Sequence, residues 1–374
     1  MSPPTEALQR ITRLAPLPEL LARLDALVQP VPPKDLEPAA AVGSTLAADA
    51  AVSGPVPPVP VAMRDGWAVA AELVSDAGPY APALLPQPPA WVETGEAMPP
   101  GTDAVLPLDA VSVSKTGDEV HTPATPGDGV MSAGADAASG GVLRRAGERL
   151  RPGDVAVLRV AGIANVSVRM PRITIFCASV PTRSTADTIS PLLARAIEAE
   201  GCVAGVAQAA SLETALLDRA CDAIVTIGGT GAGRRDASVK TLARLGKVEI
   251  HGFGIAPGET AALGFVDSRP VLMLPGRLDA ALAAFLIVGR QLLRRLTGWM
   301  GKEPSIPLPL TKKIASTVGI AEAVLMRKVE NGIEPLASGF FSLSALAQAD
   351  GWVLVPPESE GFAAGTIIAM RLLP

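Results

Sequence analysis

Residues 222–236 join a strand pattern to a glycine-rich turn, and this stretch constrains the fold most strongly. Residues 223–227 form a short, apolar, β-branched run that is typical of a buried strand. Four glycines follow within six residues, then two arginines and Asp236, and we expect a helix over 237–245. Such a turn lets backbone N–H groups approach an anion such as phosphate. The spacing matches neither common phosphate-loop pattern, so a plain turn that needs glycines for packing is the alternative.

Strand and helix patterns alternate over residues 171–300. A serine and a proline at 190–191 are a helix start signal, and Gly201 is a stop signal. The alternation indicates an α/β domain with a mostly parallel sheet and helices on both faces. Ligands of such sheets bind beyond the carboxyl ends of the strands, where Ser179, the glycine loop, Asp236 and residues 275–276 would gather. We expect strands at 172–178, 203–206, 223–227, 248–250 and 271–274, and helices at 191–200, 211–220, 237–245 and 279–296.

The flanking regions carry different patterns. Apolar residues recur at helical spacing over 5–28, which predicts two short helices around Pro16 and Pro18, and residues 39–48 and 158–163 predict two more. Short β segments separated by turn residues fill 50–132, and a linker at 302–309 leads to a final all-β stretch. We therefore expect a helical and extended N-terminal domain (1–49 and 133–170), an inserted β domain (50–132), the α/β domain (171–300) and a small C-terminal β domain (304–374).

The composition argues against several classes of protein. A net charge of −5 and a pI near 5.3 argue against a nucleic-acid surface. The three cysteines, Cys177, Cys202 and Cys221, form no C-x-x-C pair, so buried free thiols in a reducing compartment are expected. The isolated His121 and His251 argue against a zinc site. No secretory signal and no apolar run long enough to span a bilayer are visible, so we expect a cytoplasmic protein without membrane contact.

Two motifs lie in the β-rich region. Residues 61–69 wedge an Arg-Asp-Gly turn, with Asp65 at its centre, between apolar residues and lead into a strand. Asp and Gly are ordinary turn residues, so a hairpin corner is the structural interpretation of this motif. Residues 92–106, which include Thr94, alternate turn residues with short strands.

Five motifs together resemble the MoeA/gephyrin E-domain family of molybdopterin molybdenumtransferases. Residues 62–69 (AMRDGWAV) are similar to its SAMDGYAV with one extra arginine, and residues 94–105 (TGEAMPPGTDAV) resemble its TGAxxPxGADAV. Residues 228–236 (GGTGAGRRD) look like its GGVSVGxxD, and residues 274–276 (LPG) match the start of its LPGNP. Residues 349–351 (ADG) resemble its AxG. The motifs follow the family's order and run from one end of the chain to the other.

The resemblance implies an elongated homodimer with an active site between the α/β domain of one subunit and the N-terminal region of the other. It implies insertion of molybdate into adenylyl-molybdopterin with Mg²⁺ and release of AMP. Partners would be a molybdopterin adenylyltransferase or a recipient molybdoenzyme. It makes Asp65 and Asp236 the candidate catalytic residues, with Asp236 also the metal ligand. The implied substrate-binding residues are Thr94, Gly228, Gly229, Thr230, Gly231, Gly233, Pro275, Gly276 and Ser338.

Several charged residues of the family pattern are replaced. The family's Thr-Gly-Asp-Glu reads Cys-Ala-Ser-Val at 177–180, so its carboxylates are missing. Its Lys-Pro-Gly-Lys-Pro reads Ala-Pro-Gly-Glu-Thr at 256–260, which removes both lysines and adds Glu259. Near a surface, an acid in place of a lysine facing phosphate costs about 1–2 kcal/mol. Its Gly-Glu-Asp reads Gly-Glu-Arg at 147–149, and its Asn-Pro reads Arg-Leu at 277–278.

The sequence leaves three questions open: the role of the new arginines, the role of Asp236 and the function of the protein. Arg234, Arg235 and Arg277 either restore anion binding in another geometry or are solvated surface residues. Asp236 either serves the reaction or caps the following helix. The protein is either a molybdenum-inserting transferase or a catalytically reduced paralogue that binds molybdopterin or finished cofactor for delivery or assembly. A third candidate function is a binding module for another nucleotide-like anion, because fold resemblance alone does not fix function.

Overall fold

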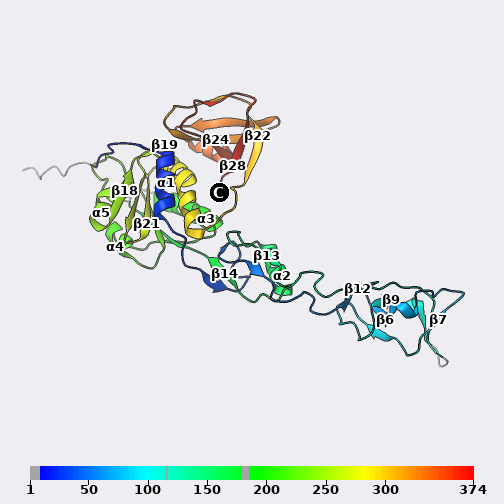
Figure 1. The fold of residues 1–374 in the computed structure, drawn as a ribbon. Coiled ribbons are helices and arrows are strands. Elements are labelled where there is room, and N and C mark those ends of the chain that lie inside the picture. Colours follow the sequence, from blue (N-terminus) through cyan, green and yellow to red (C-terminus); the bar gives the residue numbers. More distant parts are fainter. Residues whose placement is uncertain (1–8, 114–116, 179–184) are drawn as a thin grey trace, which may run out of the picture. The chain divides into compact units, whose positions relative to one another are not determined.

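The computed structural model describes residues 9–113, 117–178 and 185–374, with only the backbone for 185–187. The chain divides into two compact units. The first, here called the main unit, comprises Met1–Ala48, Ala146–Pro152 and Asn165–Pro374. The second, here called the β unit, comprises Asp49–Arg145 and Gly153–Ala164 (Figure 1). The four-domain division expected from sequence stays a prediction at its finer boundaries.

A six-stranded sheet forms the centre of the main unit. Strands β16, β15, β17 and β21 run parallel to one another, and β20 is antiparallel to both β21 and β18. The prediction of a mostly parallel α/β sheet is therefore confirmed. In spatial order the strands are β16 (Val203–Val206), β15 (Arg172–Cys177), β17 (Ala223–Ile227), β21 (Arg269–Leu274), β20 (Ala262–Val266) and β18 (Lys247–His251).

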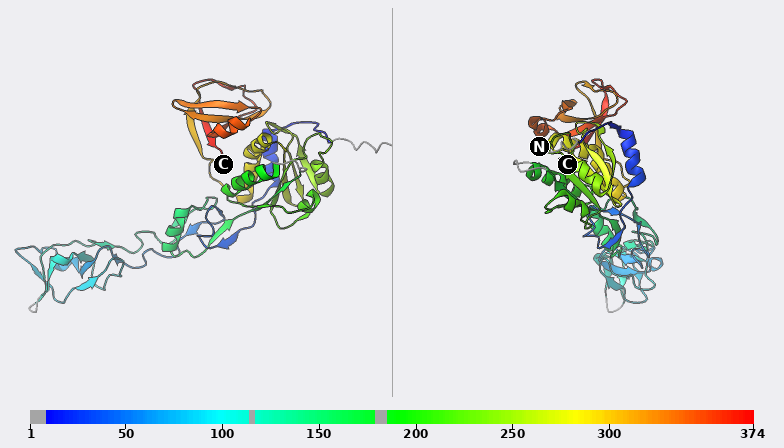
Figure 2. Two further views of the ribbon diagram at one scale, coloured as in Figure 1. Left: turned by 180° about the vertical axis from the view of Figure 1, so that it is seen from behind. Right: turned by 90° about the vertical axis from the view of Figure 1, so that its left-hand side faces the viewer.

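Helices cover both faces of this sheet because its central strands are apolar on both sides. Val225 and Ile227 of β17 join a core with α1, α3, α6 and α7, whereas Ile224 packs in a second core with α4 and α5. Figures 1 and 2 show these two helical layers around the sheet. The helices are α1 (Leu17–Leu27), α3 (Thr185–Ala199), α4 (Leu212–Leu217), α5 (Ser238–Leu245), α6 (Leu278–Ala284), a π turn (Phe285–Gly289) and α7 (Arg290–Thr297).

Several predicted helix boundaries are wrong. Helix α3 starts at Thr185, so the proline at 191 lies inside it, and the preceding Ser190 hydroxyl contacts the Cys177 sulfur at 2.9 Å instead of capping the helix. Residues 39–48 form turns and then β3 (Thr45–Leu46), because the backbone of β3 pairs with β14 (Val166–Arg169). Only α1 is helical within the described residues 9–28, and α4 ends three residues before the expected position.

A seven-stranded sheet connects the N-terminal strand to the C-terminal region. Its order is β1 (Ala15–Pro16), β19 (Phe253–Ala256), β24 (Ala321–Val329), β26 (Gly351–Val355), β28 (Ile367–Leu372) and β22 (Ser305–Pro309), with β25 (Gly332–Ser338) beside β24. The predicted linker at 302–309 is therefore largely wrong, because β22 pairs with β28 along its whole length. Smaller elements complete the main unit, namely β2 (Lys34–Leu36), β23 (Ile314–Ala315), β27 (Gly361–Phe362) and α8 (Leu343–Gln348).

The β unit consists of small sheets, as the turn-rich sequence predicts. Strand β6 (Gly66–Val69) lies between β8 (Ala90–Val92) and β9 (Ala104–Leu106). Gly66 is required there, because a Cβ would lie 2.0 Å from the Leu106 carbonyl oxygen. The expected helix at 158–163 is displaced, since α2 spans Pro152–Val160. The other strands are β4 (Ala50–Ala51), β5 (Val61–Ala62), β7 (Ala83–Leu84), β10 (Val111–Ser112), β11 (Glu119–Val120), β12 (Val130–Met131) and β13 (Val142–Arg144).

Within the described ranges, no helix has the length and apolarity needed to cross a lipid bilayer.

Candidate functional site

The glycine loop, residues 228–236, leaves the carboxyl end of β17 in a conformation that glycine favours. Gly228 and Gly229 have φ angles of +93° and +73°, which L side chains rarely adopt. The Ser238 hydroxyl donates to the Gly228 carbonyl at 2.9 Å, and the Ser238 N–H donates to the Gly229 carbonyl at 3.0 Å. A Cβ on Gly229 would lie 2.2 Å from the Ser238 oxygen. The loop is therefore folded back tightly onto the start of α5.

The strand order places this loop at a topological switch point. The chain passes from β15 to β16 on one side and then crosses to β17 on the other side of β15. Open α/β sheets bind ligands in the crevice at such a point, beyond the carboxyl ends of the strands. The loop occupies that crevice edge, next to Ala178, whose N–H donates to Ile227 at 2.8 Å. The predicted neighbour Ser179 lies outside the described residues.

Two side chains hold three consecutive carbonyl groups of the loop. The Gln9 Nε2 donates to Gly231 at 2.9 Å and to Gly229 at 3.3 Å, and His251 Nε2 lies 2.9 Å from the Thr230 oxygen. In the part of the chain that the structure describes, the N–H groups of residues 229–232 donate no hydrogen bond. The loop therefore keeps a run of free donors, which is the property that an anion site requires.

Asp236 closes the loop rather than capping the helix. Its Oδ2 accepts the Gly233 N–H at 2.9 Å, and its own N–H donates to the Gly233 carbonyl at 3.0 Å. The cap residue of α5 is Ala237, which makes no side-chain cap bond. The helix-cap alternative for Asp236 is therefore wrong. Its Oδ1 accepts no hydrogen bond from the described residues, so one carboxylate oxygen remains available.

Asp65 and Thr94 form a second cluster, in the β unit. The Asp65 Oδ1 accepts both the Thr94 N–H and the Thr94 hydroxyl, each at 2.8 Å. The backbone bond first and the hydroxyl bond second lower the pKa of Asp65 below its usual value. Asp65 therefore stays ionised at neutral pH and tethers the 92–106 segment to the turn before β6.

The extra arginine of this turn has a structural role. Arg64 Nε donates to the Val105 carbonyl at 2.9 Å, and its guanidinium covers Gly129, where a Cβ would lie 2.6 Å from Nε. The pKa of Asp128 is lowered chiefly by the Thr125 N–H, with a smaller contribution from the Arg64 charge. The insertion thus ties β9 to the neighbouring loop of the β unit.

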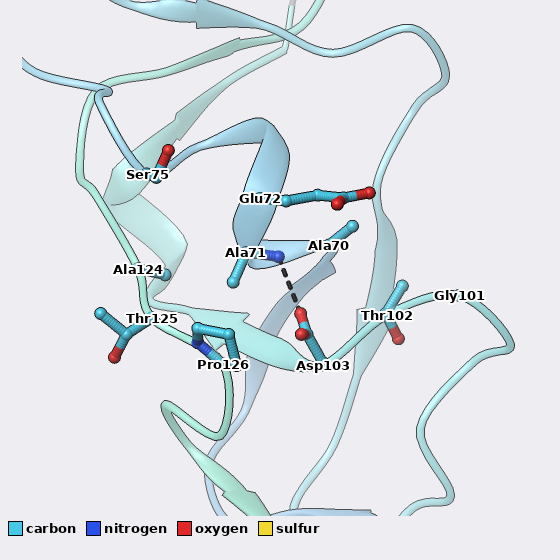
Figure 3. Close-up of a pocket in the computed structure, with 10 residues that line it drawn as sticks. All are labelled: Ala70, Ala71, Glu72, Ser75, Gly101, Thr102, Asp103, Ala124, Thr125 and Pro126. Carbon is cyan, nitrogen blue, oxygen red and sulfur yellow. Dashed lines mark hydrogen bonds between the residues drawn. The ribbon is translucent and has the colours of Figure 1, made fainter.

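A separate cavity of about 520 Å³ lies in the β unit (Figure 3). Its lining includes Glu72, Thr102 and Asp103, and Asp103 Oδ1 accepts the Ala71 N–H at 2.7 Å. Neither Asp65 nor Thr94 lines it. In the main unit, a cavity of about 500 Å³ lies beside the carboxyl end of β15, with Cys177 and Ser190 in its wall.

Comparison with known proteins decides the family. The MoeA N-terminal region (domain I and II) matches residues 3–162, and a probable molybdopterin binding domain matches residues 172–295. The chain belongs to the MoeA family. A putative molybdopterin biosynthesis protein of Methanocaldococcus jannaschii is 27% identical to it over 349 residues, which cover 83% of this chain and 85% of the relative.

Further relatives of this MoeA-family chain agree. Molybdopterin molybdenumtransferase 2 of Mycobacterium tuberculosis is 26% identical over 371 residues, covering 87% of this chain and 91% of the relative. A solved molybdopterin biosynthesis MoeA protein from Pyrococcus horikosii superposes with a TM-score of 0.78 at 26% identity, covering 97% of this chain and all of that one. The predicted multidomain fold, with its α/β, inserted β and C-terminal β regions, is confirmed by this match.

The remaining predicted substrate-binding residues lie just after β21 and at the end of β25. Pro275 and Gly276 follow β21, and Ser338 is the exposed last residue of β25. The two segments meet through Asp279, which pairs with Arg277 at 2.5 Å and accepts the Phe341 N–H at 3.4 Å. Arg277 also stacks on Phe340, with 5.3 Å between the guanidinium carbon and the ring centre. Arg277 is thus a paired residue that links two segments, which weakens its case as a free anion ligand.

The residues at the replaced positions of this MoeA-family chain, and the new arginines, differ in their contacts. Glu259 accepts the Gly258 N–H of its own turn at 2.9 Å. The Cys177 sulfur contacts the Ser190 hydroxyl at 2.9 Å. Burial raises the pKa of the core thiol Cys202 to about 12, so that thiol is inert. Arg234 and Arg235 are exposed on the glycine loop itself. Gln9 and His251 were missed by sequence reasoning, since neither belongs to a recognisable motif.

Proposed function

We propose that this MoeA-family chain inserts molybdate into adenylyl-molybdopterin with release of AMP, in molybdenum cofactor biosynthesis. The observation that supports this most is the glycine loop at the switch point of the sheet, with its run of unbonded N–H groups. Phosphate is the anion that such loops bind, and adenylyl-molybdopterin carries a pyrophosphate linkage.

The residues of the glycine loop would act mainly by positioning the substrate. The N–H groups of residues 229–232 would hold phosphate oxygens, and the exposed Arg234 and Arg235 would supply positive charge beside them. Thr230, which is 1% exposed, bonds its hydroxyl to Thr260 at 3.1 Å and so contributes to loop shape. Pro275, Gly276 and Ser338 would line the opposite side of the bound pterin.

The two candidate carboxylates have different properties. Asp65 is ionised at neutral pH because Thr94 lowers its pKa, so it would act as a hydrogen-bond acceptor or charge rather than as a general acid. Asp236 has one free oxygen, and Mg²⁺ typically takes one or two carboxylates together with substrate phosphates and water. The described residues contain no group of three or more metal-ligating side chains, so the proposed Mg²⁺ site relies on Asp236 alone. Bound there, Mg²⁺ would neutralise phosphate charge.

We also propose a cytoplasmic homodimer that receives its substrate from a molybdopterin adenylyltransferase or passes its product to a recipient molybdoenzyme. The three cysteines form no disulfide, which is compatible with a reducing compartment. The placement of Asp65 and Thr94 in one unit and of the glycine loop in the other is compatible with a site completed by a second subunit.

A second candidate function is supported by the replaced residues. A chain that lacks the family's carboxylates at 177–180 and carries Glu259 in place of a lysine could bind molybdopterin or finished cofactor without turning it over. This reduced paralogue would use the same glycine loop for delivery or assembly.

One experiment separates the two functions. Purified protein would be mixed with adenylyl-molybdopterin, molybdate and Mg²⁺, and AMP release would be followed by chromatography while binding is measured by calorimetry. The transferase proposal predicts binding with AMP release. Binding without AMP release would support the paralogue, and no binding would overturn both.

A further inference from the structure

Gln9 bridges the first arm of the glycine loop and the start of α5, although it lies more than 200 residues away in sequence. Its amide nitrogen donates to the carbonyls of Gly229 and Gly231, and its amide oxygen accepts the Val239 N–H at 3.2 Å. Val239 lies in the first turn of α5, so one side chain connects the first arm of the loop to the helix that follows it. The Gln9 residue is 5% exposed, which makes these bonds difficult for water to replace.

The chain before α1 is fixed in place where it delivers Gln9. The Ala15 N–H donates to Gly252 at 2.9 Å, and β1 pairs in parallel with β19. Gly252 has a φ of +100°, and a Cβ there would lie 2.5 Å from the Ile11 side chain and 2.7 Å from the Arg13 carbonyl. This close packing holds the segment from Ile11 to Pro16 against the residue that follows His251.

The carboxamide group is suited to this position because it has two donor hydrogens and an acceptor oxygen. The loop presents two carbonyls and the start of α5 presents one N–H, which is the matching set. With His251 on the Thr230 carbonyl, all three carbonyls from 229 to 231 are bonded to side chains. Each carbonyl shares a peptide plane with the N–H of the next residue, so these three bonds also fix the directions of the free N–H groups of residues 230–232.

We propose that Gln9 is a positioning residue of the anion site, which orients the N–H groups of Thr230 and Ala232 toward a bound phosphate. The inference rests on the proposed function, because it assigns Gln9 to the same site. Its consequence is that the segment preceding α1 determines ligand affinity without touching the ligand.

Two substitutions test this role. Gln9→Glu keeps the acceptor but, when ionised, has no donor, and it directs a negative charge at two carbonyls. Because the position is 5% exposed and faces two carbonyls, the pKa of the introduced carboxyl should lie above its usual value of about 4.3. When protonated it regains one O–H donor, so mild acid should rescue it. Gln9→Leu has neither group at any pH. Gln87→Glu, at an exposed position of the β unit, is the charge-matched control.

Binding of inorganic pyrophosphate would be measured by calorimetry at about pH 8 and about pH 5. We expect Gln9→Glu to weaken binding by about tenfold at the higher pH and to recover at the lower pH relative to wild type. Gln9→Leu should be weak at both, and Gln87→Glu should match wild type. Equal affinity of wild type and Gln9→Glu at both values would overturn the positioning role.

Hydrogen exchange of the Val239 amide checks the contact without any ligand. We expect faster exchange in Gln9→Leu and retained protection in Gln9→Glu, whose carboxylate still accepts that N–H. Unchanged exchange in Gln9→Leu would show that the contact does not exist in solution and would overturn the inference. Failure of wild type to bind either pyrophosphate or adenylyl-molybdopterin would instead overturn the proposed function, and the positioning role with it.

Discussion

The glycine loop and the 256–260 turn are neighbours, but they differ in whether their backbone N–H groups are free or bonded. They touch through the Thr230 and Thr260 hydroxyls, 3.1 Å apart. The glycine loop has its carbonyls bonded to distant side chains and keeps its N–H groups free. The 256–260 turn bonds the Gly258 N–H to its own Glu259 carboxylate. The glycine loop can therefore accept an anion, whereas the N–H of Gly258 in the 256–260 turn is already bonded to a carboxylate of the same turn.

This difference shows that, in this MoeA-family chain, backbone N–H donors are present where the charged side chains of the family pattern are not. The glycine loop of the family pattern is retained, whereas lysines and carboxylates of that pattern are replaced.

Breaking the glycine loop should have the largest effect. Gly229→Ala forces a side chain into a φ of +73° and places its Cβ 2.2 Å from the Ser238 oxygen. At about 1–3 kcal/mol of strain, we expect a loss of ligand affinity of about tenfold or more. Calorimetry with adenylyl-molybdopterin measures it. Gly205→Ala is the control, since a Cβ there meets nothing within 4 Å and its φ is not positive. Undiminished binding by Gly229→Ala would show that the loop does not hold the ligand.

Reversing the charge of the 256–260 turn should sharpen the comparison. Glu259→Lys replaces repulsion of phosphate by attraction, and about 1–2 kcal/mol corresponds to a gain of about tenfold in affinity. The gain should shrink as ionic strength rises, because Glu259 is exposed. Glu259→Gln, which only removes the acid, should give a smaller gain. Identical affinities of Glu259→Lys and wild type would place this turn away from the bound phosphate.

Removing the arginines of the glycine loop should have a moderate effect. Arg234→Ala combined with Arg235→Ala removes two exposed charges, and we expect a loss of affinity of about threefold to fivefold that salt abolishes. Arg277→Ala is the matched control, because its guanidinium is already paired with Asp279. If the Arg277 variant loses more affinity than the double variant, the two sets of arginines have been assigned the wrong way round.

The pH dependence of Asp65 should be the smallest effect. Its folded-state pKa is lowered below the usual 3.8, so its contribution to stability is present above that value and is lost as pH falls through the folded pKa. Thr94→Val removes the hydroxyl donor and keeps the larger backbone bond, so the pKa of Asp65 should rise but stay below normal. Carbon-13 NMR of the carboxyl group measures it, with Thr102→Val as control. A normal pKa in wild type would contradict the hydrogen bonds described.

The sheet strands were predictable because burial on both faces demands continuous apolar runs. Residues 223–227 and 271–274 are such runs, and both are strands. β19 and β20 were missed because Gly254 and Gly264 interrupt their apolar patterns. At both positions a neighbouring backbone lies too close to allow a side chain. A Cβ on Gly264 would lie 2.3 Å from the Lys247 carbonyl. The serine–proline start signal failed because α3 had already begun at Thr185, six residues earlier.

The site was predictable only where its chemistry resides in the backbone. Glycine spacing reveals the loop at 228–233 directly. Gln9 and His251 carry no pattern, because their roles depend on tertiary contacts made across 222 and 21 residues of sequence. The different fates of the new arginines, with Arg277 paired and Arg234 exposed, likewise depend on neighbours that only the folded chain brings together.

The most direct test of the central claim is an amide NMR titration of the isotope-labelled protein with adenylyl-molybdopterin. If the glycine loop holds the phosphate through its backbone, the amide signals of residues 229–232 should show the largest shifts in the main unit. The Gly258 amide, already bonded to Glu259, should shift much less. Saturable binding that leaves the four loop amides unmoved would contradict the claim.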